Sequence, residues 1–160
     1  MVKKFLFYAV MLVGAMTLSS CGGDEDEPTP EFKIYETFNT WGASKSQALA
    51  EMKKLGWTYV TEAGNEVVFE MRNKDIESSV YFDEHGGLLS VYVFYHGYNS
   101  FFNDLKNELS KRYNIVWKDN PQTISGTTAT GDTDASIWTF NHKTKGESMA
   151  YYLSAHFDPW

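Results

Sequence analysis

Hydrophobic side chains recur at two different spacings along the chain, and each spacing predicts a different kind of element. Between residues 44 and 55 the spacing is helical, because the apolar positions fall on one face of a helix: Ala48, Leu49, Met52 and Leu55. Ser44 is a suitable N-cap, and Gly56 stands where helices commonly end. We therefore predict a helix over residues 44–55.

After Gly56 the apolar positions alternate with polar ones, which is typical of half-buried strands. The alternating apolar or β-prone positions are Trp57, Tyr59, Thr61, Val67, Phe69, Met71, Val80 and Phe82. Gly64-Asn65 and residues 83–87 are predicted turns. Residues 88–95 are apolar on both faces, which indicates a central strand or one with a functional aromatic face.

The second half of the chain shows the same order of patterns. Residues 99–112 carry an apolar stripe at helical spacing: Phe101, Phe102, Leu105 and Leu109. Four strand-like segments follow, at residues 114–118, 123–130, 136–141 and 149–157. Upstream of the first helix, apolar side chains within residues 32–41 are expected to attach that segment to the folded body: Phe32, Ile34, Tyr35, Phe38 and Trp41.

A weak internal similarity accompanies this order. At a spacing of 57 residues, Asp75, Ser79 and His85 match Asp132, Ser136 and His142, and at a spacing of 60 His96 matches His156. We therefore predict an α+β fold. It would consist of two tandem helix-plus-four-strand (αββββ) pseudo-repeats, about residues 43–97 and 99–158, which form antiparallel sheet with the helices packed on one face. The alternative is a single α+β sheet without internal symmetry.

The pattern of the first residues predicts an export signal. Lys3 and Lys4 precede the apolar run Phe5–Leu18, which is too short to span a membrane and suits the core of a signal peptide. Leu18-Ser19-Ser20-Cys21 follows and resembles the lipobox of bacterial lipoproteins. In that family the signal is removed before the cysteine, which receives the lipid. The resemblance implies a signal peptide over 1–20 and a membrane anchor through acyl chains, such as palmitate, on Cys21.

An acidic segment follows the predicted anchor. Asp24 to Glu27 are four consecutive acidic residues between Gly22-Gly23 and Pro28, so residues 21–35 are predicted to be a solvated tether before a single domain over 36–160. Acidic residues behind a lipidated cysteine resemble the surface-export signal of some Gram-negative lipoproteins. We expect display on the outer face of the outer membrane, with a periplasm-facing anchor as the alternative.

The start of the first helix carries a second resemblance. Trp41-Gly42-Ala43-Ser44, followed by Ala48, Leu49 and Met52, is similar to a helix start in two groups of proteins. One is the β-lactamase-inhibitor-protein-like fold of tandem helix-plus-four-strand repeats. The other is the SmpA/OmlA-type outer-membrane lipoproteins, which assist barrel assembly. In the inhibitor family a concave sheet face binds another protein and there is no catalytic residue to carry over, so the resemblance implies a fold more than an activity.

Composition and charge exclude several classes of protein. The chain is 42% hydrophobic and 16% aromatic, too rich for a disordered protein. The net charge is −7 and lysine and arginine form no block in the body of the chain, so we predict no nucleic-acid role. Cys21 is the single cysteine, which leaves no internal disulfide and no zinc site of several thiolates.

Catalytic and metal chemistry have weak support. The four histidines, His85, His96, His142 and His156, show no paired-ligand spacing, and no Gly-x-Ser-x-Gly motif occurs. Acidic residues could supply a glycosidase pair, but acids on an exposed sheet face explain them equally well: Glu62, Glu66, Glu70, Asp83 and Glu84. Asp132-Thr133-Asp134 is predicted to be a turn. We expect no enzyme activity, no metal and no cofactor.

The aromatic residues are the better functional signal, because a core of this size cannot readily enclose all of them. One set on the strands should face the helices, and the other should be available for contact with protein or glycan. The candidate ligand-binding residues are Tyr81, Tyr92, Phe94, Trp138 and Tyr151. We therefore predict a lipid-anchored, non-enzymatic binding module, and alternatively a periplasm-facing accessory lipoprotein of an envelope complex.

Overall fold

The computed structural model describes residues 32–72, 75–119, 124–128 and 130–156. The predicted signal peptide, the lipidation site Cys21 and the acidic run of the tether lie outside the described residues. The described elements, in chain order, are α1 (Lys45–Lys54), β1 (Thr58–Ala63), β2 (Glu66–Glu70), β3 (Ile76–Phe82), β4 (Leu88–Tyr95), the 3₁₀ turn η1 (Asn99–Phe101), α2 (Phe102–Tyr113), β5 (Ile115–Asp119), β6 (Ile124–Thr128), β7 (Thr133–His142) and β8 (Gly146–Ala155).

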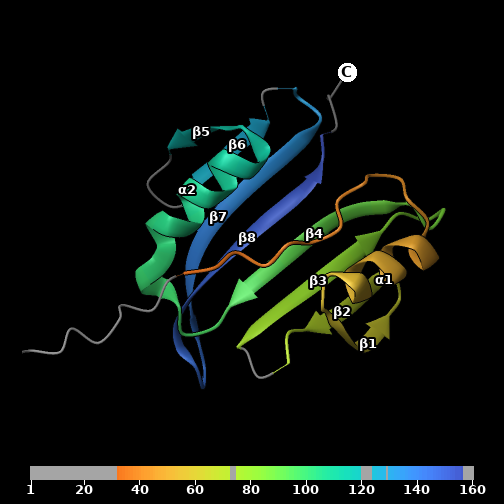
Figure 1. Cartoon of the computed structure of the whole chain (residues 1–160), viewed down its shortest axis with the longest axis horizontal. Coiled ribbons are helices and arrows are strands. Elements are labelled where there is room, and N and C mark those ends of the chain that lie inside the picture. The colour runs from red at the N-terminus through yellow and green to blue at the C-terminus, as the bar shows by residue number, and fades with distance from the viewer. Residues whose placement is uncertain (1–31, 73–74, 120–123, 129, 157–160) are drawn as a thin grey trace, which may run out of the picture. The chain divides into compact units, whose positions relative to one another are not determined.

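All eight strands belong to one antiparallel sheet with the order β1-β2-β3-β4-β8-β7-β6-β5 (Figure 1). Consecutive strands pair as neighbours everywhere except at the centre, where β4 pairs with β8. There Val91 lies opposite Leu153, and Tyr92 lies opposite Tyr152. This central pairing joins the two halves of the chain into a continuous sheet, with β1 and β5 as its open edges.

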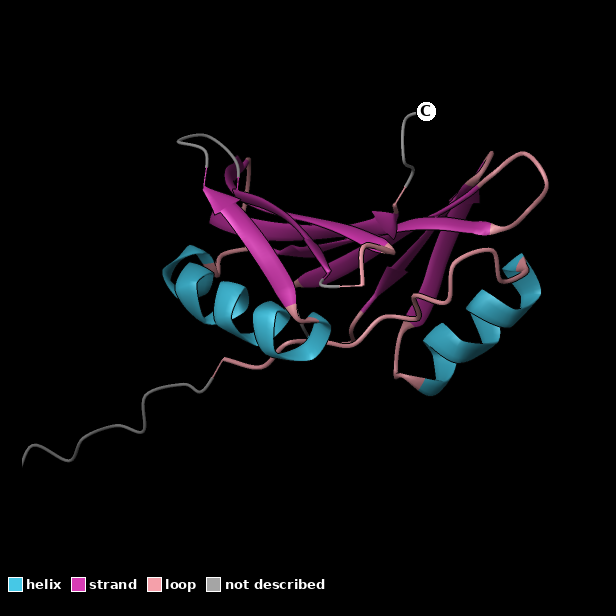
Figure 2. Cartoon of the chain, turned by 90° about the horizontal axis from the view of Figure 1, so that it is seen from above, coloured by secondary structure: helices cyan, strands magenta, loops and turns pink. Residues whose placement is uncertain are grey.

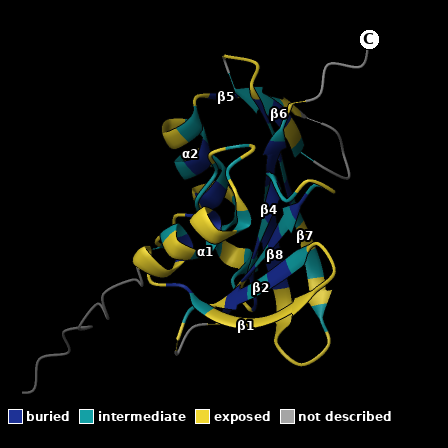
Figure 3. Ribbon diagram, turned by 90° about the vertical axis from the view of Figure 1, so that its right-hand side faces the viewer, coloured by how far each residue is buried: buried dark blue, intermediate teal, exposed yellow. Residues whose placement is uncertain are grey.

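One side of the sheet carries the hydrophobic core. Alternate residues of the central strands point to this side and are fully buried, among them Val91, Val93 and Tyr95 on β4 and Met149, Tyr151 and Leu153 on β8. Figure 3 shows the contrast between these buried central strands and β1, of which nearly every residue is exposed. The core therefore depends on the middle of the sheet rather than on its edges.

The cover over this core is partly helix and partly extended chain. α1 and α2 lie apart, and the segment that precedes α1 runs between them (Figures 1 and 2). Ile34 in this segment is buried, and the aromatic side chains predicted to attach it do pack against the core: Phe32, Tyr35, Phe38 and Trp41. That prediction is confirmed.

Two buried tyrosines hold the backbone of Tyr35 in this segment. The Tyr95 hydroxyl accepts a hydrogen bond from the Tyr35 N–H at 3.0 Å, and the Tyr151 hydroxyl donates to the Tyr35 carbonyl at 3.1 Å. Extended chain over an apolar core would otherwise bury its polar groups without partners, which is costly. The two hydroxyls remove that cost for this residue.

The predicted fold class is wrong. The described residues do not form two αββββ pseudo-repeats with helices packed on a sheet face: they form mostly one eight-stranded antiparallel sheet, with two α-helices and 21% helix. The physical reason is that the apolar stripes of the helices are short. α1 buries only Ala48 and Met52, and α2 buries only Leu105 and Leu109, so the extended segment must complete the cover.

Individual elements fall close to their predicted places. The Ser44 side chain caps α1 by accepting from the Gln47 N–H, as predicted, and Gly56 follows the helix with a φ of +93°. β7 and β8 are longer than predicted, at ten residues each, and form one long hairpin. In the described part of the chain, neither helix has the length and hydropathy needed to cross a membrane.

Candidate functional site

The face of the sheet opposite the core carries rows of aromatic side chains on its four central strands. Residues paired directly across neighbouring strands point to the same face. Tyr92 on β4 pairs with Ser79 of β3 and with Tyr152 of β8, while Phe94 pairs with Ala150, which itself pairs with Trp138 of β7. Serine and alanine beside the large rings give the rings room to lie over the sheet.

The rings on this face form one connected series, which we call the aromatic face. Its members are Tyr81, Tyr92, Phe94, Trp138, Phe140 and Tyr152, with His96 and His142 at one end. Tyr92 is central, with its ring centroid 4.5 Å from that of Tyr152, 5.4 Å from Tyr81 and 6.3 Å from Trp138. Phe94 continues the series to Phe140 at 6.1 Å.

The six aromatic side chains of this face are partly exposed, in contrast to the fully buried tyrosines of the other face. Most of their contacts are edge-to-face, including Tyr92 on Trp138 and Phe94 on Phe140. Such contacts hold each ring in place while part of it stays accessible. The surface is therefore apolar and largely pre-formed, two properties that favour binding.

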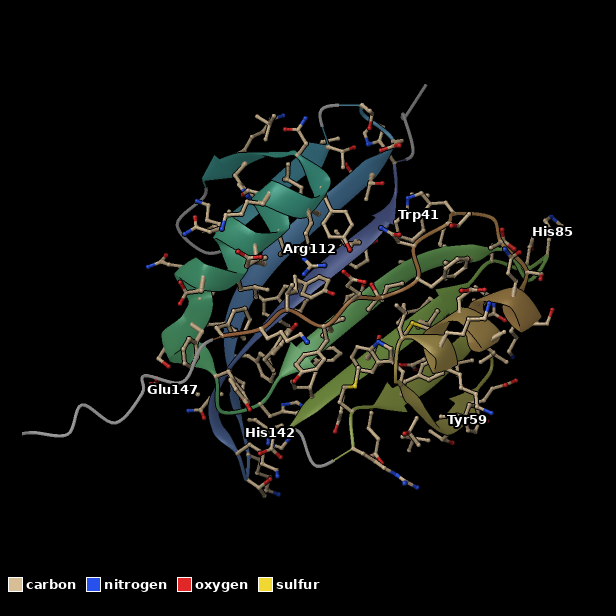
Figure 4. The ribbon with its side chains drawn as sticks, in the orientation of Figure 1. Trp41, Tyr59, His85, Arg112, His142 and Glu147 are labelled. Carbon is tan, nitrogen blue, oxygen red and sulfur yellow. The ribbon has the colours of Figure 1, made fainter. Side chains whose placement is uncertain are left out.

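The histidine end of the face contains a buried polar group. His96 is 7% exposed, and neither of its ring nitrogens has a hydrogen-bond partner among the described residues. Its Nε2 lies 3.5 Å from Glu77 Oε2, and its ring centroid lies 4.4 Å from that of His142. His142, which is labelled in Figure 4, accepts a hydrogen bond at Nδ1 from the Lys145 N–H at 3.1 Å. The proton of the neutral ring is therefore on Nε2.

Charge on this face is one-sided. Over the five strands β2, β3, β4, β8 and β7, the described residues of this face include four carboxylates, Glu66, Glu70, Glu77 and Asp134, and no lysine or arginine. The Tyr81 hydroxyl donates to Glu66 at 2.8 Å. Burial and this contact raise the pKa of Tyr81 to about 12. The aromatic face therefore has acidic flanks.

The structure brings together four of the five predicted ligand-binding residues, Tyr81, Tyr92, Phe94 and Trp138. The fifth, Tyr151, lies on the core side with 0% exposure, and its neighbour Tyr152 takes the place on the aromatic face. Sequence analysis also missed Phe140, His96 and His142. Phe140 shares strand parity with Trp138, a signal that was available, whereas the His96–His142 contact depends on tertiary structure.

The other candidate residues have local structural roles. His85 lies in an exposed turn beside Glu84 (Figure 4). Asp83 accepts from the His85 and Gly87 N–H groups, which lowers its pKa.

Three further acidic residues also have local hydrogen-bond or ion-pair partners within the fold. Asp132 accepts from the Thr128 and Thr130 hydroxyls in the turn before β7. Glu62 forms an ion pair with Lys45, and Asp134 pairs with His156 Nδ1 at 2.9 Å. Within the described ranges, no group of three or more histidine, cysteine, aspartate and glutamate side chains is placed to hold a metal ion.

Comparison with known proteins adds no assignment. No protein-family model matches the sequence, no curated protein matches it, and no solved structure matches it. The resemblances to lipoproteins and to the inhibitor family therefore stay predictions, and a functional assignment depends on the chemistry of the aromatic face.

Proposed function

We propose that this protein is a non-enzymatic binding module that holds a partner protein on its aromatic face and is anchored to the outer membrane through lipid on Cys21. The observation that carries the binding role is the connected series of partly exposed rings across β3, β4, β8 and β7. Aromatic side chains in fixed positions are the residues that most often supply binding energy at protein interfaces.

The acidic flanks favour a basic partner. Carboxylates beside aromatic rings attract lysine and arginine side chains both by ion pairing and by cation–π contact. Glu66, Glu70 and Glu77 line one side of the face, and Asp134 lies on β7 at the other. Neutral glycans gain nothing from this charge, so the surface fits a polypeptide that presents basic side chains next to apolar ones.

Photo-crosslinking in cells tests the binding role. Benzoylphenylalanine replaces Trp138 on the aromatic face, and in a matched control it replaces Lys54 on the exposed side of α1, where Lys54 pairs with Glu51 at the surface. We expect a discrete protein adduct from position 138 that is absent from position 54 and is lost when Tyr92→Ala is added. Equal labelling from the two positions, or no adduct from position 138, rejects the aromatic face as a protein-binding site.

The anchor and its orientation are tested separately. We expect radiolabelled palmitate to label the wild-type protein and not Cys21→Ala. Protease treatment of intact cells, with a periplasmic marker as control, should remove the folded domain if it is displayed outside. Protection until the outer membrane is opened contradicts surface display and supports the periplasm-facing accessory role instead.

A further inference from the structure

A second surface lies at the open edge formed by β1, on the core side of the sheet and therefore on the face opposite the aromatic face. A pocket of about 570 Å³ opens between α1 and this strand. Its lining residues are Leu49 and Lys53 of α1, Gly56, Trp57, Thr58 and Tyr59 leading into β1, and Phe69 of β2. Trp57 and Phe69 are each only 2% exposed, so the floor is apolar and firmly held. The volume lies within the range of ligand-binding pockets.

The strand beside the pocket is an unpaired sheet edge. β1 pairs with β2 on one side only, so alternate N–H and C=O groups on its other side have no strand partner. Tyr59, which is labelled in Figure 4, and Val60 are large hydrophobic residues on this edge. They are 52% and 48% exposed. The register shifts between Tyr59 and Thr61, so the regular edge next to the pocket is short.

The pocket carries one cation at its rim. Of the three lysines of α1, Lys45 pairs with Glu62 and Lys54 pairs with Glu51 at 2.6 Å, whereas no described carboxylate pairs with Lys53. Lys53 lines the apolar pocket. An apolar floor with a cation at the rim is complementary to a ligand that carries an apolar side chain next to a carboxylate.

We propose that this groove binds the C-terminal end of an extended peptide, which adds a short strand to the edge of β1. The terminal apolar side chain enters the pocket over Trp57 and Phe69, and the terminal carboxylate pairs with Lys53. Because Lys53 lies beside the residues that open β1, the peptide ends where β1 begins, so it runs antiparallel to β1. Backbone hydrogen bonds to the strand edge supply affinity, and the pocket supplies selectivity for the last side chain.

Fluorescence anisotropy with defined peptides tests this proposal on the purified full-length protein. The probe is a labelled pool of octapeptides that end in Val, Leu or Phe with a free carboxylate, compared with the same pool amidated at the C-terminus. We expect the free-carboxylate pool to bind with a Kd of about 10 to 100 μM, and the amidated pool about tenfold more weakly. Lys53→Gln should remove that difference, whereas the matched control Lys54→Gln should keep it.

Three results would overturn the proposal. The first is that the free-carboxylate pool does not bind below about 1 mM. The second is that the free-carboxylate and amidated pools bind equally well. The third is that Lys53→Gln keeps the wild-type preference for the free-carboxylate pool. Nuclear Overhauser contacts from the peptide to Thr58–Val60 should report the added strand. A dimer in sedimentation that forms through β1 would make a second copy the occupant and would contradict the proposal. The Tyr92→Ala/Trp138→Ala variant should still bind the pool, which separates this site from the aromatic face.

Discussion

The rings of Tyr92 and Tyr152 lie with their centroids 4.5 Å apart across the central β4–β8 pair, on the face of the sheet opposite the core. Tyr151, one residue away on β8, points to the other side and is fully buried. Two adjacent tyrosines therefore serve different purposes: Tyr151 belongs to the core, and Tyr152 belongs to the candidate binding surface.

Truncation of the two tyrosines should have very different effects on stability. Tyr151→Ala removes a buried ring and its hydrogen bond to Tyr35, and should lower the free energy of unfolding by about 3 to 5 kcal/mol. Tyr152→Ala removes a partly exposed ring and should lower it by about 1 to 2 kcal/mol. Urea unfolding followed by circular dichroism measures both values. Equal losses of unfolding free energy would contradict the assignment of Tyr151 to the core and of Tyr152 to the aromatic face.

Stability should fall at alkaline pH because of the buried tyrosines. Burial raises the pKa of Tyr95 and of Tyr151 above the ordinary value of 10.0. A raised pKa in the folded state means that the neutral phenol is favoured by folding, so this stability is fully present below pH 10 and is lost as the pH rises beyond it.

Urea midpoints measured from pH 8 upward should therefore decline above about pH 10. Tyr95→Phe lacks one of the ionising groups and should show a shallower decline, although it starts from a lower value because the hydrogen bond from Tyr35 is lost. The matched control is Tyr59→Phe, which changes a ring that is 52% exposed and should keep the wild-type slope. Identical slopes in wild type and Tyr95→Phe would refute this account.

The acidic flanks should contribute to partner capture. If the partner is basic, Glu66→Gln/Glu77→Gln should reduce the adduct from benzoylphenylalanine at position 138 about fivefold, and added salt should reduce the wild-type adduct in the same direction. Glu51→Gln/Glu108→Gln is the matched control, because these two carboxylates pair with lysines on the helices. An adduct that is insensitive both to salt and to the face carboxylates would show that charge does not select the partner.

Gly126 on β6 should not tolerate a side chain. A Cβ at this position would lie 2.6 Å from Ile115 Cγ2 and 2.6 Å from the Val116 carbonyl oxygen, closer than real Cβ contacts. Gly126→Ala should therefore lower the free energy of unfolding by about 1 to 3 kcal/mol, since neighbouring backbone must move. Thermal denaturation measures the loss, and Ser125→Ala on the exposed side of the same strand is the control. An unchanged Tm for Gly126→Ala would refute the close approach.

Local features of the fold could be predicted from sequence because they depend on neighbouring residues. Ser44 caps α1, and the alternation of Val67 and Phe69 with polar residues places β2, without reference to the rest of the chain. The pairing of β4 with β8 could not be predicted in this way, because it joins strands far apart in sequence. The attachment of residues 32–41 was predicted from their apolar side chains, but the hydrogen bonds of Tyr95 and Tyr151 that hold Tyr35 over the core were not. For that reason the helices received too large a role in the predicted fold.

The aromatic face was predicted in outline because strand parity alone assigns Tyr92 and Phe94 to one side of β4. The error at Tyr151 arose because β8 carries tyrosine at both parities. Its small and polar residues, Ser148, Ala150 and Ser154, share the parity of Tyr152, and that pattern was the signal for the correct assignment. The ring contact of His96 with His142 needed the three-dimensional arrangement of the β7–β8 hairpin.

The hydrogen bonds of Tyr95 and Tyr151 to Tyr35 also set an order of events during folding. Tyr35 stands near the start of the described residues, whereas Tyr151 belongs to β8, the last described strand. Until β8 joins the sheet, one edge of β4 is unpaired and the Tyr35 carbonyl lacks its hydrogen bond from Tyr151. Such non-local contacts are slow to form and leave a partly folded chain exposed to aggregation. The segment around Tyr35 can therefore take its final place only after β8 has paired with β4. A chain that stops before β8 cannot complete its core.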